Sequence, residues 1–157
     1  MRKRIIGHGP SEVAAAAPRW LDLERWAQVE ITSEEVDYPI EAALMPGTGP
    51  GWRAAQPGEQ LIRLRFDEPH RLRRIHLMFQ EGEQERTQEF VLRWSPDGGQ
   101  SYREIVRQQF NFSPPGATRE EEDYEIDLDW VTALELKLMP DISGGSARAS
   151  LAQLRLS

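Results

Sequence analysis

Residues 61–66 read LIRLRF, a segment in which apolar and cationic side chains alternate strictly. Ile62, Leu64 and Phe66 fall on one side of an extended chain, and Arg63 and Arg65 fall on the other. Because successive side chains of a strand point to opposite faces, this pattern predicts a strand between a core and solvent. Strands with one apolar and one polar face are typical of antiparallel sheets, whereas strands of parallel sheets are apolar on both faces.

Seven further segments carry patterns typical of strands, separated by residues that favour turns. They span residues 27–32, 72–79, 88–94, 102–110, 123–128, 133–139 and 150–156. Strands do not alternate with helical segments, which disfavours a parallel α/β sheet. Two sheets that are each apolar on one face bury those faces against each other. We therefore predict an all-β fold, an antiparallel β-sandwich of eight strands without a long helix beyond residue 30.

The length of 157 residues fits one domain, which can bury roughly 70% of the surface that its unfolded chain exposes. We predict an N-terminal tail and lead-in at residues 1–26, with a helical turn within residues 20–26. The β-sandwich binding domain is expected at residues 27–157. The basic start lacks the apolar stretch of a signal peptide. A cytoplasmic protein is therefore expected, or an exported one if a leader has been removed.

Composition narrows the possible partners and chemistry. The chain has no cysteine and carries a net charge of −7. Disulfides and thiolate sites are therefore excluded, and phosphate backbones and anionic membranes are repelled. Three scattered histidines give no metal-binding spacing, and no catalytic motif occurs. We expect neither nucleic acid nor membrane as a partner, and no enzyme activity. The acidic run at residues 120–123 predicts a solvated strand edge.

The lengths of the connections suggest where a ligand binds. Residues 33–60, 80–87, 111–122 and 140–149 form long connections, and residues 67–71, 95–100 and 129–132 form short ones. Successive connections of antiparallel strands lie at alternate ends, so the four long ones are expected together. Binding residues are common on loops that a rigid scaffold holds. The long-loop end is therefore the candidate functional face, unless these loops only carry insertions.

Polar and aromatic residues in the long connections are the candidate ligand contacts. An aromatic ring can stack on a pyranose, and arginine or asparagine can hydrogen bond to hydroxyl or carboxylate groups. The alternatives are that the tryptophan and phenylalanine pack in the core and that the arginines are solvated. The candidates are Trp52, Arg53, Arg86, Asn111, Phe112, Arg119, Asp141 and Arg148.

Three segments resemble those of one domain family. Residues 51–66 read GWRAAQPGEQLIRLRF, residues 89–102 read EFVLRWSPDGGQSY, and residues 149–156 read ASLAQLRL. In order and spacing they resemble motifs of the galactose-binding-like (discoidin) domains, over residues 27–157. The resemblance implies an eight-stranded jelly roll that binds ligands, often sugars, through loops at one end.

Two departures from that family pattern concern a structural calcium ion. Many relatives place an Asp-Gly pair shortly before the tryptophan of the first segment, and a glutamate in the last strand. Here residues 44–47 read LMPG, and Gln153 replaces the glutamate. Calcium prefers several oxygen ligands that include carboxylates, so we expect no calcium site and no other cofactor.

Two functions remain open. The leading hypothesis is a non-catalytic binding module that recognises carbohydrate or a similar polyol at the long-loop face. The alternative is an intracellular protein–protein interaction domain that uses the same face, as some members of the resembled family do. A hydrolase is the weakest possibility, because the sequence contains no set of catalytic residues.

Overall fold

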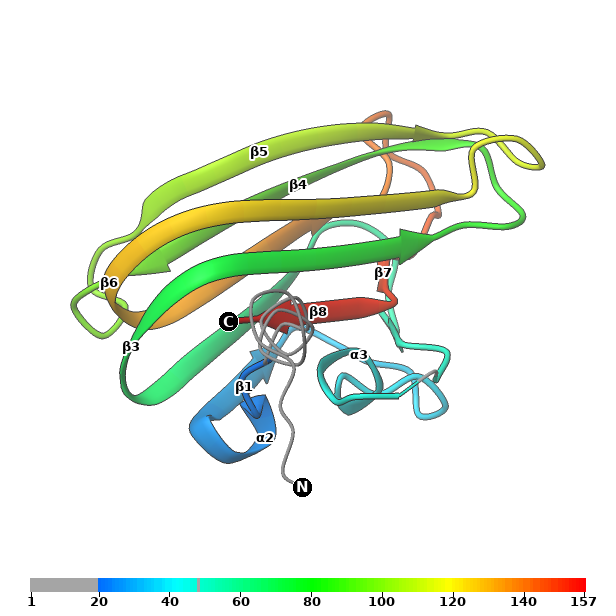
Figure 1. Cartoon of the computed structure of the whole chain (residues 1–157). Helices are drawn as coiled ribbons and strands as arrows, with labels where there is room; N and C mark the ends of the chain where they lie inside the picture. The colour runs from blue at the N-terminus through cyan, green and yellow to red at the C-terminus, as the bar shows by residue number, and fades with distance from the viewer. Residues whose placement is uncertain (1–19, 48) are drawn as a thin grey trace, which may run out of the picture.

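Two long strands run through both layers of the sandwich (Figure 1). The computed structural model describes residues 20–47 and 49–157. Strands β3 (Gln60–Gln80) and β6 (Arg119–Met139) each span 21 residues and pair antiparallel to each other. Both strands bend in the middle, so their two halves belong to different sheets.

The larger sheet contains five strands. Its order is β1 (Ala27–Ile31), the first half of β3, the second half of β6, β4 (Arg86–Ser95) and β5 (Arg103–Phe112). The smaller sheet combines the second half of β3 with the first half of β6 and with β8 (Gln153–Leu156). A short separate ladder joins β2 (Trp52–Arg53) to β7 (Ser150–Leu151). All these pairings are antiparallel, as predicted.

The apolar faces of the two sheets meet in a single core. Ile62 and Leu64 of the larger sheet are each 1% exposed, and Ile75 and Leu77 of the smaller sheet are fully buried. Phe79 stacks across the layers on Phe90 of β4, with ring centroids 5.4 Å apart. Each such side chain contributes roughly 1.5–3 kcal/mol on burial. The alternating patterns of the sequence therefore identified this core.

Two of the predicted short connections are not turns. Residues 67–71 lie within β3 and residues 129–132 within β6, so four expected strands are in fact two. The bends keep their pairing because both strands curve together, with register shifts between Arg65 and Arg74. Pro69 lies in this irregular stretch, where a missing backbone donor is tolerated. Local sequence cannot distinguish such a bend from a turn.

The remaining differences concern short elements. Residues 1–19 of the predicted tail lie outside the described part, and the predicted helical turn is observed as α2 (Leu23–Trp26). The first long connection contains helix α3 (Glu41–Leu44) and β2. The expected strand at 150–156 is divided into β7 and β8 at Ala152. Among the described residues, no helix has the length and apolar character to cross a membrane.

A buried arginine fastens α3 to the smaller sheet. Arg155 Nη1 donates to Ala43 O at 2.7 Å, and Nη2 donates to Met45 O at 2.8 Å. These carbonyls lie at the C-terminal end of α3, where backbone acceptors lack helical partners. Burial lowers the pKa of Arg155. This contact anchors the connection that leads into β2.

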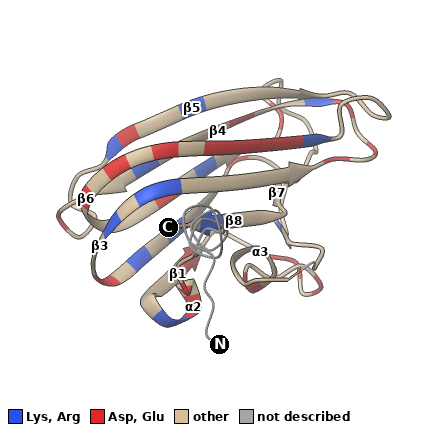
Figure 2. Cartoon of the chain, in the orientation of Figure 1, with Lys and Arg blue, Asp and Glu red and all other residues tan. Residues whose placement is uncertain are grey.

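Charged residues cover the outer face of the smaller sheet. Figure 2 shows acidic residues along the first half of β6 and basic residues along β3. They pair across the strands: Arg71 Nη2 lies 2.8 Å from Asp127 Oδ1, and Arg74 binds Asp123. Exposed ion pairs of this kind contribute little to stability individually, but they fix the polar side of the sheet.

The four long connections gather at one end of the sandwich, on the right in Figure 1, and the 96–102 turn and the two bends lie at the other. Gly51 directly precedes β2 at the long-loop end and has φ +82°. An added Cβ there would lie 2.4 Å from Leu151 O and 2.8 Å from Ala152 Cα. The close approach of β2 to β7 therefore depends on glycine at this position.

Replacing Gly51 with alanine is expected to destabilise the fold by about 2–5 kcal/mol, since a left-handed backbone and an overpacked contact add together. Gly58 is the matched control, because it has φ +87° and no atom within 4 Å of an added Cβ. Gly58→Ala should cost only about 1–2 kcal/mol. Urea denaturation measures both, and equal losses would contradict the importance of the close contact.

Candidate functional site

A hollow of about 490 Å³ opens at the long-loop end. Three of the four long connections line it, namely those preceding β3, between β3 and β4, and preceding β7. We call it the loop-end hollow and define it by Glu35, Tyr38, Arg53, Glu81 and Arg148. Its lining is mainly polar, which suits a hydroxyl-rich ligand.

One carboxylate holds the two arginines of the hollow. Glu35 Oε1 accepts from Arg148 Nη1 at 2.6 Å, and Glu35 Oε2 lies 3.8 Å from Arg53 Nη1. The arginine side chains are 46% and 47% exposed, so much of each guanidinium faces solvent. An arginine fork has five N–H donors, and these contacts occupy only some of them. Donors therefore remain free for a ligand.

The backbone fixes this arrangement before any ligand arrives. Glu35 N donates to Arg53 O at 2.9 Å, and Arg53 N donates to Tyr38 O at 3.1 Å. The Arg53 guanidinium lies 4.4 Å from the centroid of the Tyr38 ring. Arg53 is also paired with Ser150 in the ladder of β2 and β7. Arg53, Tyr38 and Glu35 thus form one local unit, to which Arg148 is attached from 113 residues away.

Trp52 forms part of the packed wall and offers almost no free surface. Its residue is 1% exposed, and its indole Nε1 donates to Ser33 O at 2.9 Å. The sequence left open whether Trp52 contacts a ligand or packs in the core. The structure shows that it packs in the core.

Arg86 supports the loops and does not present its guanidinium to solvent. Its side chain is 1% exposed, Nε donates to Glu81 Oε1 at 2.7 Å, and Nη1 donates to Pro140 O at 2.8 Å. Glu81 also accepts from the backbone N–H groups of Glu83 and Gln84. Arg86 therefore ties the connection after β3 to the connection after β6.

Phe112 packs beneath this junction. It is fully buried, with the Arg86 guanidinium 4.7 Å from its ring centroid and the Phe110 ring 5.0 Å away. Like Arg86, it was a candidate ligand contact in the sequence, but burial gives both residues a supporting position. Their influence on binding would pass through the loops that they hold.

The other three candidates, like Arg86 and Phe112, lie outside the loop-end hollow. Asn111 Oδ1 accepts a hydrogen bond from the Thr87 hydroxyl. Asn111 and Asp141, together with Arg86 and Phe112, line a separate hollow of about 540 Å³. Asp141 accepts from the Ser143 hydroxyl at 2.7 Å, and hydrogen bonds from Ser143 lower its pKa. Arg119 is exposed, with Nη2 3.1 Å from Glu121 Oε2. The structure thus brings Trp52, Arg53 and Arg148 together at the loop-end hollow. It brings the other candidates except Arg119 together at the separate hollow, namely Arg86, Asn111, Phe112 and Asp141.

Sequence reasoning did not select Glu35, Tyr38 or Glu81. Glu35 and Tyr38 lie in an irregular segment with an ordinary surface composition, and Glu81 follows a strand. Their partners Arg148 and Arg86 are known only from the folded chain. No local pattern could have identified them.

Glu120 is buried beside the loop supports, contrary to the predicted solvated edge at residues 120–123. The residue is 1% exposed, and Oε1 accepts from Gln88 Nε2 at 3.0 Å. Gln88 in turn accepts from Arg86 at 3.3 Å. Burial and the neighbouring Glu122 raise the pKa of Glu120 to about 8. Only alternate members of the acidic run face solvent, because the run is a strand.

Metal ligands do not gather in the described part of the chain: no group of three or more histidine, aspartate or glutamate side chains is placed to hold an ion. The expected absence of calcium stays a prediction for experiment.

No family model matches the sequence, and no curated protein matches it. Solved structures with the same fold do exist. A family 32 carbohydrate-binding module of NanJ from C. perfringens, in complex with galactose, has a TM-score of 0.64 at 11% identity. It matches 87% of this chain and 96% of its own. The corresponding module of AlyQ, in complex with 4,5-unsaturated mannuronic acid, has a TM-score of 0.65 at 14% identity, with 89% and 98% covered.

A pectin-binding module gives a TM-score of 0.60 at 15% identity and covers 85% of this chain and 91% of its own. At such identities the likeness establishes the fold, a β-sandwich shared with carbohydrate-binding modules.

Replacing Glu120 with glutamine is expected to make the stability of the fold less dependent on pH between about 5 and 8. The folded carboxyl keeps its proton up to about pH 8, whereas the ordinary value is 4.5. Unfolding therefore releases a proton in this window, and the parent protein loses stability as pH rises. Glutamine has no proton to release. The stabilisation by Glu120→Gln should grow by a few kcal/mol from pH 5 to pH 8.

Denaturation curves at pH 5, 6.5 and 8 measure this effect, with Glu121→Gln as the control. Glu121 neighbours Glu120, but its side chain is 49% exposed. A similar pH profile for the two variants would show that burial of Glu120 is not the cause.

Calcium removal is expected to leave the melting temperature unchanged. Residues 44–47 and Gln153 supply no carboxylate where the resembled family has them. An ion present at 100 times its dissociation constant would stabilise the fold by about 2.7 kcal/mol, which shifts melting by several degrees. Thermal unfolding with calcium and with chelator decides the point, and a lower melting temperature in chelator would contradict it.

Proposed function

We propose that this chain is a non-catalytic module that binds carbohydrate in the loop-end hollow. The observation that carries the proposal is the triad of Arg53, Arg148 and Glu35 at the mouth of an open polar hollow. The volume of about 490 Å³ lies within the range of roughly 300–1,000 Å³ that is usual for ligand pockets. A sandwich fold shared with sugar-binding modules is consistent with this role.

The chemistry of the triad matches that of vicinal hydroxyl groups. Each sugar hydroxyl donates one hydrogen bond and accepts others. The free N–H groups of the arginines supply donors, and the Glu35 carboxylate supplies an acceptor for a hydroxyl proton. The exposed pair of Arg53 and Glu35, 3.8 Å apart, contributes little to stability, so its groups are available to a ligand.

Pre-organisation favours binding by such a small polar surface. Ordering flexible side chains and loops on binding costs free energy, and a fixed site avoids part of that cost. The backbone bonds of Glu35 and Arg53 fix one side of the hollow, and Arg86 fixes the loop that carries Glu81. Arg86 and Phe112 would therefore affect binding as positioning residues.

Sugars bound by the similar structures guide the choice of test ligands. These sugars are galactose, 4,5-unsaturated mannuronic acid and pectin. A glycan array that contains these classes beside neutral glucans would identify the preferred sugar. Isothermal titration with that sugar then measures affinity.

Replacing Arg148 with alanine is expected to weaken binding of that sugar about tenfold or more. The variant loses charged hydrogen bonds to the ligand, worth roughly 1.5–3 kcal/mol each, and releases Glu35. Arg119→Ala is the matched control, since Arg119 is an exposed arginine of the same end that lies outside the hollow. It should change affinity less than twofold.

Equal effects of the two substitutions would contradict the assignment of the site. If no glycan binds and a protein partner is found whose binding depends on Arg148, the hollow belongs to a protein-interaction domain and the carbohydrate proposal fails.

A further inference from the structure

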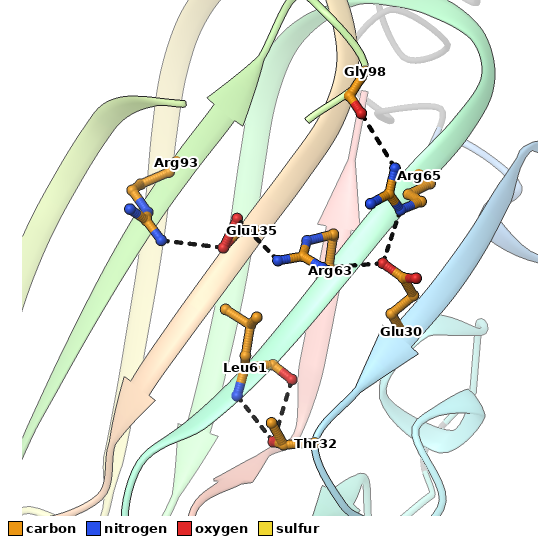
Figure 3. Close-up of polar contacts among 8 residues, drawn as sticks. All are labelled: Glu30, Thr32, Leu61, Arg63, Arg65, Arg93, Gly98 and Glu135. Atoms are coloured by element: carbon orange, nitrogen blue, oxygen red, sulfur yellow. Dashed lines mark hydrogen bonds and ion pairs between the residues drawn. The ribbon is translucent and has the colours of Figure 1, made fainter. Parts of the chain in front are cut away.

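Strand β1 forms an open edge of the larger sheet. It lies at one end of the strand order and pairs only with β3 among the described residues. Thr32 directly follows β1, and its backbone N–H donates to Leu61 O at 3.1 Å. Figure 3 shows this contact between Thr32 and Leu61. Hydrogen-bonded and non-bonded pairs alternate along an antiparallel ladder. Gln28 and Glu30, like Thr32, therefore direct their backbone groups toward β3.

The other three residues of β1, namely Ala27, Val29 and Ile31, direct their backbone groups toward the open edge. The Ala27 N–H donates to Leu23 O. Within the part of the chain that the structure describes, the outward N–H and C=O groups of Val29 and Ile31 have no hydrogen-bond partner. A further strand added at this edge would complete these bonds.

An apolar hollow of about 430 Å³ lies beside the same edge. It is lined by the half-buried residues Ala27, Val29 and Ile31 and by the buried residues Ile40 and Leu44. Figure 1 shows β1 close to α2 and α3 on this side of the molecule. Because every second side chain of a strand points to the same face, a strand added to β1 would place alternate side chains in the hollow.

The charged residues that line the hollow are all acidic. They are Glu24, Glu34 and Glu41, which are exposed, and no lysine or arginine lines the hollow. None of the three forms an ion pair with another described residue. Glu34 Oε2 accepts from the Ile40 N–H at 2.8 Å, which leaves its other oxygen for a cation.

Two arginines of neighbouring segments do not neutralise these acids. Arg25 of α2 lies 5.0 Å from the centroid of the Trp26 ring and has Asp22 on the same helix. Arg155 is 7% exposed and is held by two carbonyl oxygens at the end of α3. With Asp22 counted beside the three glutamates, four acids and these two arginines give a net charge of −2. The hollow therefore favours a cationic occupant.

We propose that the β1 edge and this hollow, together the edge groove, bind an extended segment of a partner protein that carries aliphatic side chains on one face and lysine or arginine at its ends. The segment adds an antiparallel strand to β1. Its aliphatic side chains enter the hollow, and its cations meet Glu24, Glu34 and Glu41. A second copy of this chain is disfavoured, because β1–β1 pairing would bring the glutamates of both copies together.

The edge groove shares no lining residue with the loop-end hollow. A protein partner bound at β1 therefore leaves the loop-end hollow accessible, and the inference does not rest on the carbohydrate proposal. Arg148→Ala, which tests the loop-end hollow, should leave binding at the edge groove unchanged. Loss of binding in this variant would place the partner segment at the loops and overturn the proposal.

The probe is a fluorescein-labelled peptide RRVTVTVRR with an amidated C-terminus, in which the valines form the apolar face. Fluorescence anisotropy with the full chain should show saturable binding that weakens as salt screens the charges. EEVTVTVEE, and RRVTVTVRR methylated at its valine nitrogens, should bind at least tenfold more weakly. The first lacks the cations, and the second cannot donate to β1. Equal binding of either control, or no binding of the probe, would overturn the proposal.

Variants locate the charged contacts. Glu24→Gln combined with Glu41→Gln should weaken binding of the probe about fivefold or more, since both carboxylates line the hollow. The matched control is Glu85→Gln combined with Glu125→Gln, which removes the same charge at exposed residues outside the hollow. Its effect should be less than twofold. Equal losses would show that the probe is attracted to the acidic chain as a whole, and the proposal would fail.

Amide hydrogen exchange tests the added strand directly. The N–H groups of Val29 and Ile31 should exchange at least tenfold more slowly when the probe is bound, because they gain hydrogen-bond partners. Gln28 and Glu30 are the internal comparison, since their N–H groups already face β3. Unchanged exchange at Val29 and Ile31 in the presence of saturating probe would contradict strand addition.

Two further measurements separate other occupants from a partner protein. Sedimentation velocity should find no dimer that the probe disperses. The combined variant Arg2→Gln, Lys3→Gln and Arg4→Gln, which neutralises the basic start of the chain, should bind the probe with unchanged affinity. A dimer dispersed by the probe would assign the edge groove to a second copy, and tighter binding by the variant would assign it to the chain's own start. Either result would overturn the assignment to a partner protein.

Discussion

The pairing of β3 with β6 is the constraint on which the rest of the structure depends. These two strands run through both sheets, and they pair on both sides of their bends. Because they bend together, hydrogen bonding continues from one layer into the other and the apolar faces are brought into contact. Strands β1, β4 and β8 then add to the edges that these two strands provide, and β5 adds to β4. The bends also decide which ends of the strands meet, and hence where the long connections gather.

The loop end gains its shape from a few buried polar contacts. Arg86 joins two connections through Glu81 and Pro140, and Arg155 holds the end of α3 against β8. Both guanidinium groups are buried, where an unpaired charge would be costly. Their hydrogen bonds to carboxylate and carbonyl oxygens offset that cost and make the loop positions specific. The exposed arginines, Arg53 and Arg148, are left to face solvent on a surface that these contacts hold in place.

On the outer face of the larger sheet, arginines pair across neighbouring strands instead of holding loops in place. Arg63 and Arg93 share Glu135 across neighbouring strands, and Tyr102 lies against both. Strand pairing places these side chains in a row, so their spacing is set by the sheet and not by a loop. A surface of this kind is stiff and extended, whereas the loop-end hollow is compact.

The sequence by itself determined the fold class and the core, because alternation of apolar and polar residues follows directly from strand geometry. The pattern at 61–66 placed Ile62 and Leu64 in the core, and the lengths of the connections indicated the end at which the loops meet. It could not show that residues 67–71 and 129–132 are bends, since a bend and a turn share the same local residues. It also placed Glu120 in solvent, although the strand turns that side chain inward.

The site was determined only in part by the sequence. Arg53 and Arg148 were chosen for their chemistry and their loops, but Glu35, which holds both, is far from Arg148 along the chain. Trp52, Arg86 and Phe112 carry side chains suited to ligand contact, and only packing shows that they are buried. Local sequence records what a side chain can do. The partners of a side chain and its exposure depend on segments that are distant in the sequence. Only the tertiary structure, which brings those segments together, therefore decided them.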